Sequence, residues 1–159
     1  MSNEYAFRKI DIDALEEEVL LPSDLVDPDP RGPDGALADA RARSQETRNF
    51  VSKGDIAGAL ATILTDPPYG EGVDEAKDLT TSAVTLILNS TRAADIPAAL
   101  KGLDQEQQAR LMAYLYKGMG ALNTNTDVAG SVLLTWHEKL TEIAGVGAIV
   151  RVLTDRRTL

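Results

Sequence analysis

His137 is the only histidine among 159 residues, and it lies in the sequence Trp136-His137-Glu138-Lys139. Imidazole is the side chain best suited to general acid–base chemistry near neutral pH, so this position is the first candidate for catalysis. A zinc-binding His-Glu-x-x-His motif would need a histidine at position 141, where the sequence has threonine. Because its neighbour is a tryptophan on a predicted helix, we interpret His137 as a hydrogen-bonding residue at a packing edge or an interface.

Other chemistry is excluded by residue types that are missing. The chain has no cysteine, so it has no disulfide, thiolate nucleophile, zinc ribbon or iron–sulfur site. Residues 145–148 (Gly-Val-Gly-Ala) lack the third glycine of a dinucleotide-binding motif and the Lys-Ser/Thr of a phosphate loop. The acidic run 11–18 lacks the glycine that a calcium-binding loop needs at its sixth position. We therefore expect no catalytic site, no metal site and no cofactor.

The formal net charge of -9 is distributed unevenly, since residues 1–35 carry net -7 and residues 36–159 carry net -2. An acidic chain is unsuited to the phosphate backbone, so we expect no nucleic-acid partner. Uncharged stretches such as 144–150 are far shorter than the ~20 residues of a membrane span. Residues 2–4 (Ser-Asn-Glu) do not begin a basic and apolar signal peptide. These features predict a cytoplasmic protein that is soluble and has no membrane partner.

The N-terminal part of the chain has two sections. Four of the seven prolines lie between residues 22 and 33, among several aspartates. Proline removes amide donors and fixes φ, so we predict an acidic, proline-rich and extended linker over residues 17–34. Residues 1–16 differ, because apolar and charged side chains nearly alternate over 7–13. This pattern predicts a tail segment that docks on a partner through one apolar side.

Residues 35–159 carry the start and stop residues of helices and no convincing pair of strands. The sequence has 4% aromatic residues, so the core has to consist largely of Leu, Ile, Val and Ala. The β-branched run 84–87 is predicted as helix because Leu79, Ala83, Leu86 and Ile87 share one helical face. The predicted helices run from Asp34 to about Lys53, from Asp55 to before Pro67, from Asp74 to about Thr91, from Asp95 to before Gly102, from Asp104 to Lys117-Gly118, from Thr126 or Asp127 to before Gly145, and over 148–153, after Gly147.

One internal similarity leaves two architectures open. Residues 55–60 (Asp-Ile-x-x-Ala-Leu) recur as residues 95–100, forty positions later. A period near forty is typical of α-solenoids of the HEAT or armadillo type. Any short buried helix with an aspartate cap would show the same pattern. The fold class is therefore all-α, either a helical bundle or a short α-solenoid of about seven helices, with an extended N-terminal tail.

The C-terminal end combines an apolar segment with positive charge. Residues 148–153 are strongly apolar and are followed by Arg156 and Arg157. This segment needs to be covered by the preceding helices or by another protein, and the basic end suits an acidic neighbour. The candidates for partner binding or packing in this region are Trp136, His137, Ile149, Arg151, Arg156 and Arg157.

Several stretches resemble one known family, in the same order along the chain. They are residues 7–13 (Phe-Arg-Lys-Ile-Asp-Ile-Asp), 114–118 (Tyr-Leu-Tyr-Lys-Gly), 133–139 (Leu-Leu-Thr-Trp-His-Glu-Lys) and 144–154. They are similar to the sixteen-kilodalton subunit, subunit 5, of the actin-related protein 2/3 complex. The resemblance covers the first fifteen residues and most of 50–159, whereas residues 16–49 depart from it freely.

The resemblance implies a non-catalytic subunit of the seven-subunit assembly that nucleates branched actin filaments from the side of an existing filament. It implies a helical body on the β-propeller subunit and a scaffold subunit, and an N-terminal segment that reaches actin-related protein 2. ATP would bind to the actin-related subunits, and actin filaments would be contacted through the complex, in the cytoplasmic actin cytoskeleton. The expected tail contacts are apolar for Tyr5, Phe7, Ile10 and Ile12, and charged for Arg8 and Lys9.

Two other functions stay open at the level of sequence. The first is a stand-alone α-solenoid adaptor in another cytoplasmic assembly, and the size of the native species separates it from a subunit of a complex. The second is a small enzyme that uses His137. Replacement of His137 by glutamine would abolish the turnover of such an enzyme, while a packing histidine would affect only stability or assembly.

Overall fold

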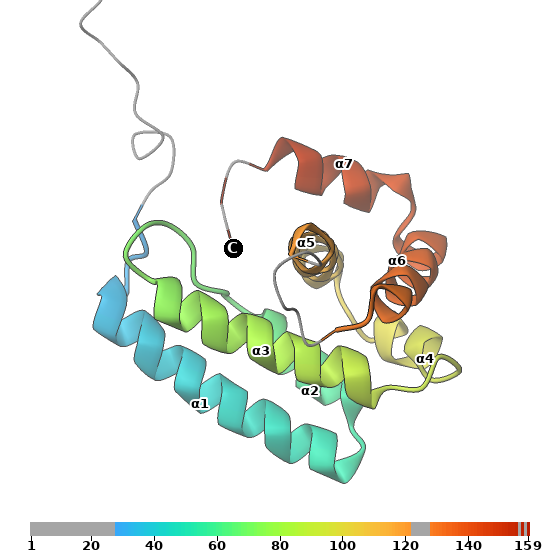
Figure 1. Cartoon of the computed structure of the whole chain (residues 1–159), viewed down its shortest axis with the longest axis horizontal. Helices are drawn as coiled ribbons and strands as arrows, with labels where there is room; N and C mark the ends of the chain where they lie inside the picture. The colour runs from blue at the N-terminus through green and yellow to red at the C-terminus, as the bar shows by residue number, and fades with distance from the viewer. Residues whose placement is uncertain (1–27, 122–127, 156, 158) are drawn as a thin grey trace, which may run out of the picture.

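The computed structural model describes residues 28–121, 128–155, 157 and 159. Within these residues the chain forms seven helices and no strand, so the all-α prediction is confirmed (Figure 1). Residues 1–16 of the predicted tail, and most of the predicted linker, lie outside the described residues. The helices are α1 (Gly32–Lys53), α2 (Ile56–Leu64), α3 (Asp74–Ser90), α4 (Ile96–Lys101), α5 (Gln105–Gly120), α6 (Gly130–Ala144) and α7 (Val146–Thr154).

The short helix α2 lies at the centre of the fold. It has no charged residue, and it contacts α1, α3, α4 and α5. A helix that is apolar on all sides is expected to be enclosed by others. Helix α5 in turn packs against α2, α6 and α7, and Figure 1 shows it end-on with α6 and α7 around it. The contacts of α5 with α2, α6 and α7 join neighbouring helix pairs (α2–α3, α4–α5 and α6–α7), an arrangement that both a bundle and a short α-solenoid contain.

Local sequence signals explain three of the helix ends, as predicted. Gly54 ends α1 with a φ of 77°, and its amide donates to carbonyls of the last turn. The Asp55 carboxylate caps α2 by accepting from the Gly58 amide at 2.9 Å. Asp104 and Gln107 form a reciprocal capping box at the start of α5, with bonds of 2.8 and 3.1 Å.

Two predicted helix starts are wrong, the one at Asp34 and the one at residue 126 or 127. Helix α1 begins at Gly32, so Asp34 lies in its first turn, where a carboxylate complements the helix dipole. Proline is tolerated at the start of a helix because the first amides have no helical acceptor, which lets α1 begin within the predicted linker. The start predicted at Asp74 is confirmed, because α3 begins there, directly after Val73. Helix α6 begins at Gly130, after the predicted starts at 126 and 127, which lie outside the described residues.

Two glycines predicted to separate helices are helical instead. Helix α5 continues past Gly118 to Gly120. A Cβ atom at Gly118 would lie 3.1 Å from the Leu133 side chain, so this glycine allows a close approach of α5 and α6. Gly147 lies in the first turn of α7, and Gly145 alone, with a φ of 70°, separates α6 from α7.

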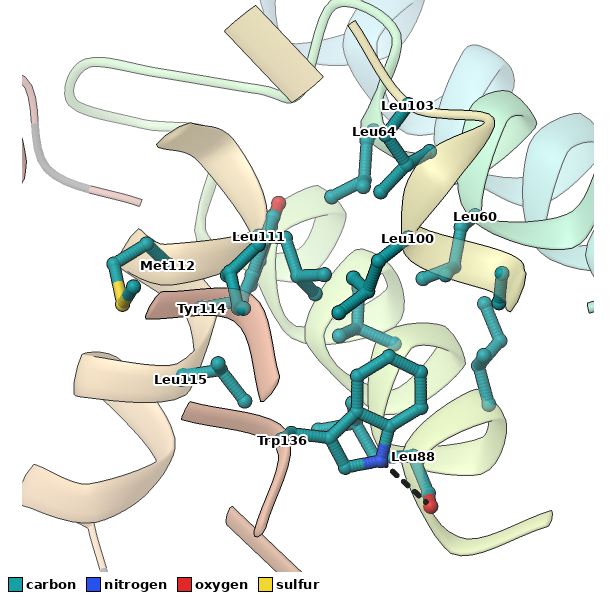
Figure 2. Close-up of a cluster of buried hydrophobic side chains, with 14 of the residues drawn as sticks. Leu60, Leu64, Leu88, Leu100, Leu103, Leu111, Met112, Tyr114, Leu115 and Trp136 are labelled. Atoms are coloured by element: carbon teal, nitrogen blue, oxygen red, sulfur yellow. Dashed lines mark hydrogen bonds between the residues drawn. The ribbon is translucent and has the colours of Figure 1, made fainter. Parts of the chain in front are cut away.

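The main core is built from large side chains around Trp136 (Figure 2). The indole N–H of Trp136 donates to the Leu88 carbonyl at 3.3 Å. That carbonyl lies in the last turn of α3, where helix carbonyls lack partners within the helix, so the bond joins α6 to the end of α3. Leu86, predicted on the buried face of α3, is 38% exposed. Helix α3 instead buries Val84 and Leu88 in the main core.

A second cluster lies between α1 and α3, and we call it the α1–α3 seam. It consists of Ala36, Ala40, Val73 and Ala76. Small residues continue along the buried face of α1 as Ser44 and Thr47. With so little side-chain volume between them, the two helices pack closely side by side (Figure 1).

Candidate functional site

The catalytic candidate is a packing residue in its observed surroundings. His137 of α6 is half-buried and meets the Tyr116 ring of α5 edge-on, with 5.6 Å between ring centroids. Its Nε2 atom lies 3.4 Å from the Tyr116 hydroxyl. In the part of the chain that the structure describes, no three His, Asp or Glu side chains are grouped to hold a metal ion. The surfaces of the bundle are therefore the remaining candidates for function.

None of the helices formed by residues 28–121 and 128–155 combines the length and the apolar character that crossing a membrane requires.

Two of the C-terminal candidates face the interior. Trp136 has no exposed surface, and Ile149 is partly buried against the same core. Their contacts are therefore with the chain's own helices. This leaves the arginines and the outer face of α7 as candidates for contact with other molecules.

Helix α7 has two apolar faces. Its inner face buries Ala148 and packs Val152 against the core. Its outer face carries Val146, Val150 and Leu153, which are 66%, 51% and 72% exposed. These three positions follow the i, i+4, i+7 spacing of one helical stripe, which we call the α7 stripe. Single exposed aliphatic residues are common on protein surfaces, but an aligned set is a candidate for an interface.

A pocket of about 650 Å³ is lined by residues of α5, α7 and the C-terminal end, together with Tyr69. We call it the α5–α7 pocket. Part of its wall is apolar, from Ala109, Ala113 and Val152. Six charged side chains also line it: Glu106, Arg110, Lys117, Arg151, Asp155 and Arg157. Four of the six are cations, so the pocket favours a partner with both carboxylates and aliphatic groups.

Three of the four cations have partners within the chain. Arg110 donates to the Leu64 carbonyl at 2.9 Å and to the Glu106 carboxylate at 2.5 Å. Lys117 donates to the main-chain oxygen of Leu159 at 3.1 Å. The Arg157 guanidinium donates two hydrogen bonds to the Asp155 carboxylate, and it lies 4.6 Å from the centre of the Tyr69 ring.

No hydrogen bond or ion pair joins the Arg151 guanidinium to the other described residues, which distinguishes it from these three cations. Its Nε atom is buried and unpartnered among those residues, as is the Nε atom of Arg110. Nearby, burial lowers the pKa of Lys117 and raises the pKa of Tyr69, which marks the pocket wall as partly shielded from water. Arg151 lines the pocket without an ion pair to the described residues, so an anionic ligand there would pair with its charge.

The structure thus brings together two of the predicted arginines, Arg151 and Arg157, at one pocket. Arg156 lies outside the described residues, as do the tail candidates Tyr5, Phe7, Arg8, Lys9, Ile10 and Ile12. Sequence reasoning missed Tyr69, Arg110 and Lys117. The seven-residue spacing of Arg110 and Lys117 places both on one face of α5 and could have indicated them, whereas no local pattern indicates Tyr69.

A protein-family model described as ARP2/3 complex 16 kDa subunit (p16-Arc) matches residues 6–159. A Xenopus laevis protein named actin-related protein 2/3 complex subunit 5-C is 36% identical over 153 residues, covering 96% of this chain and 94% of the relative. Subunit 5 of the complex from Saccharomyces cerevisiae is 36% identical over 155 residues, covering 96% and 97%. A Homo sapiens subunit 5-like protein is 30% identical over 153 residues, covering 96% and 94%.

Proposed function

From the premise that this chain belongs to the family of the ARP2/3 complex 16 kDa subunit, we propose that it is a non-catalytic structural and regulatory subunit of that complex. In this role it supports the nucleation of branched actin filaments in the cytoplasmic actin cytoskeleton, and it contacts filaments through the complex. Its helical body binds the β-propeller subunit and a scaffold subunit. Its N-terminal tail binds actin-related protein 2.

The α7 stripe is the observation that carries this proposal for the helical body. Val150 and Leu153 are 51% and 72% exposed on a helix whose opposite face is packed on the core. Aliphatic side chains aligned in this way are stabilised when a partner removes them from water, at roughly 25 cal/mol per Å² of apolar area. We assign the α7 stripe to contact with a neighbouring subunit.

The double substitution Val150→Asp and Leu153→Asp tests this assignment. It places two charges on the stripe, which should reduce recovery of the chain with the co-expressed complex at least tenfold, while the melting temperature of the free chain changes little. Ala38→Asp with Ala42→Asp is the matched control, because both alanines are exposed on α1. Equal recovery of the two double variants would overturn the assignment.

The tail forms the second half of the proposal. Residues 17–31 separate the tail from the start of α1 at Gly32. A flexible chain of that length spans roughly 20 Å on average, enough to join two neighbouring subunits and to raise the effective concentration of the tail at its site. Tyr5, Phe7, Ile10 and Ile12 supply apolar contacts, and Arg8 and Lys9 supply charge pairs.

Deletion of residues 1–14 tests the tether. We expect the truncated chain to stay with the core of the complex, while retention of actin-related protein 2 and the rate of branch formation both fall. Pull-down of the assembled complex and a branching assay measure the two effects. Normal branching with unchanged retention of actin-related protein 2 would refute the tether. A native chain that migrates alone at its mass of 17.1 kDa would contradict membership of the complex.

A further inference from the structure

The groups that line the α5–α7 pocket complement an occupant with negative charge and aliphatic side chains. Arg151 contributes a buried Nε without a partner among the described residues, and Lys117 contributes an ammonium that donates to a main-chain oxygen. Beside these cations, Ala109, Ala113 and Val152 form apolar wall. A simple inorganic anion would pair with the cations and leave that wall exposed, so a peptide with both kinds of side chain fits better.

The described chain begins close to this pocket. Arg31, three residues after Pro28, donates to the Asp66 carbonyl at 3.2 Å. The Asp66 carboxylate lies 4.0 Å from Arg110, which lines the pocket. The segment that precedes Pro28 therefore starts near the edge of the pocket.

That segment has both the negative charge and the aliphatic side chains that would complement the pocket. Residues 16–27 contain five carboxylates, two valines and three leucines, and they contain no lysine or arginine. Twelve residues span roughly 17–21 Å as a flexible chain and up to about 40 Å when extended. A chain of this length is therefore long enough to bring residues 16–18 across the pocket from its edge.

We propose that, in the subunit free of its complex, the acidic segment 16–27 of the chain docks in the α5–α7 pocket, where its carboxylates pair with Arg151 and Lys117 and its aliphatic side chains cover Ala109, Ala113 and Val152. The docked segment draws the tail against the body of the free subunit. Binding of the tail to another molecule then competes with this intramolecular contact. The contact goes beyond the proposed function and does not depend on it, because the free chain alone is sufficient to make it.

A spin label attached near the segment tests the proposal in the full-length free chain. The chain has no cysteine, so Ala14→Cys provides a single labelling site two residues before the segment. We expect the label to reduce the amide NMR signals of Ala113 and Val152 at least twofold. The amide of Ser52 should keep its intensity, because α1 extends about 30 Å from Gly32 to that end.

Charge-neutral variants give the decisive comparison. Lys117→Gln with Arg151→Gln should restore the signals of Ala113 and Val152. The same recovery should follow Glu16→Gln, Glu17→Gln and Glu18→Gln, which leave the helical body unchanged and so exclude an effect of misfolding. Arg92→Gln with Lys101→Gln removes two exposed cations away from the pocket and should restore nothing.

Two results would overturn the proposal. One is full intensity of the pocket amides in the labelled parent chain. The other is attenuation that persists in the tail variant with three glutamines, which would show that charge pairing does not hold the segment. Neither result bears on recovery with the complex, so failure of intramolecular docking is distinguishable from failure of the proposed function.

Discussion

The α1–α3 seam and the core around Trp136 both hold helices together, the seam with small side chains and the core with large ones. The seam places alanines against one another, with Val73 as its largest buried member. The main core interlocks leucines, isoleucines and one tryptophan, and Figure 2 shows the leucines around Trp136. Small side chains permit close approach of two helices, whereas large ones fill the wider space where the six helices α2–α7 converge.

The polar contacts of the two regions differ as well. Around the seam, the side-chain hydrogen bonds and ion pairs that join α1 to other segments are charged and lie at the surface: Arg41 pairs with Glu75 at 3.0 Å, and Arg43 donates to the Asp66 carbonyl at 2.7 Å. In the core, the bond from Trp136 to the Leu88 carbonyl is buried and uncharged. We therefore expect the free energy of unfolding to fall when core side chains are truncated. Around the seam, we expect it to fall when side chains are enlarged and when the pH is lowered.

Truncation of the core should have the largest effect. Trp136→Ala removes a fully buried side chain and its hydrogen bond to α3, which should lower the free energy of unfolding by about 3–5 kcal/mol. Urea denaturation followed by circular dichroism measures this loss without relying on tryptophan fluorescence. Leu134→Ala on the same helix is the control, because Leu134 is 62% exposed, and it should change stability by less than about 0.5 kcal/mol. Similar losses for both variants would show that burial in the core does not set the cost of truncation.

Enlargement should damage the seam. Ala40 is 3% exposed between α1 and α3, so Ala40→Leu forces the helices apart and should cost about 1–3 kcal/mol of unfolding free energy. Ala42→Leu makes the same chemical change at an exposed position of α1 and should be nearly neutral. The same denaturation experiment measures both variants. Equal stability of the two would indicate that the seam has room for larger side chains.

Asp55 and Asp95, which occupy the same position before α2 and α4, should differ in their contribution to stability by a smaller amount. Asp55 accepts the Gly58 amide at 2.9 Å, so Asp55→Ala should cost about 1 kcal/mol. Asp95 makes no such bond in α4, and its carboxylate accepts instead from exposed Arg92. Asp95→Ala should therefore cost only about 0.3 kcal/mol. A loss for Asp95→Ala as large as that for Asp55→Ala would contradict the observed capping geometry.

The sequence predicted the parts of the fold that depend on neighbouring residues. Gly54, Asp55 and Asp104 end or begin helices through hydrogen bonds within one turn, so their residue types and spacing suffice to identify them. The repeat at 55–60 and 95–100 predicted two short buried helices and left the overall architecture open. Both copies start short helices, α2 and α4, that bury Ala and Leu in one core, and a bundle needs such helices as much as a solenoid does.

The candidate surfaces depend on contacts that are distant in sequence, and they were less predictable. The apolar residues of α7 were recognised as needing cover, but which of them face outward depends on how α7 lies on α5. The α5–α7 pocket joins Tyr69, one face of α5 and the C-terminal residues, and these segments come together only in the folded chain. Gly118 shows the same limit, because its neighbour Leu133 belongs to another helix.

The smallest expected effect is a pH dependence of stability at the start of α1. We expect the free energy of unfolding to depend on pH through this region beside the seam, and not through the core. Asp29 forms an ion pair with Arg31 at 2.7 Å, and its side chain is 3% exposed. The hydrogen bond from Arg31 lowers the pKa of Asp29, so the folded state binds this proton more weakly than the unfolded state does. The pair therefore contributes its full stability above the ordinary aspartate pKa of about 3.9. It loses that contribution as the pH falls through the lower pKa of the folded state.

Asp29→Asn should accordingly lower the free energy of unfolding by about 0.5–1 kcal/mol at neutral pH. The difference from the parent chain should shrink as the pH falls through the lowered pKa of Asp29, because protonation then removes the same charge from the parent. Glu46→Gln removes an exposed carboxylate from α1 and should show a smaller difference with no such convergence. Denaturation curves at several pH values measure both. A difference between Asp29→Asn and the parent that grows on acidification would contradict a lowered pKa of Asp29 in the folded state, and a constant difference would assign the loss to packing.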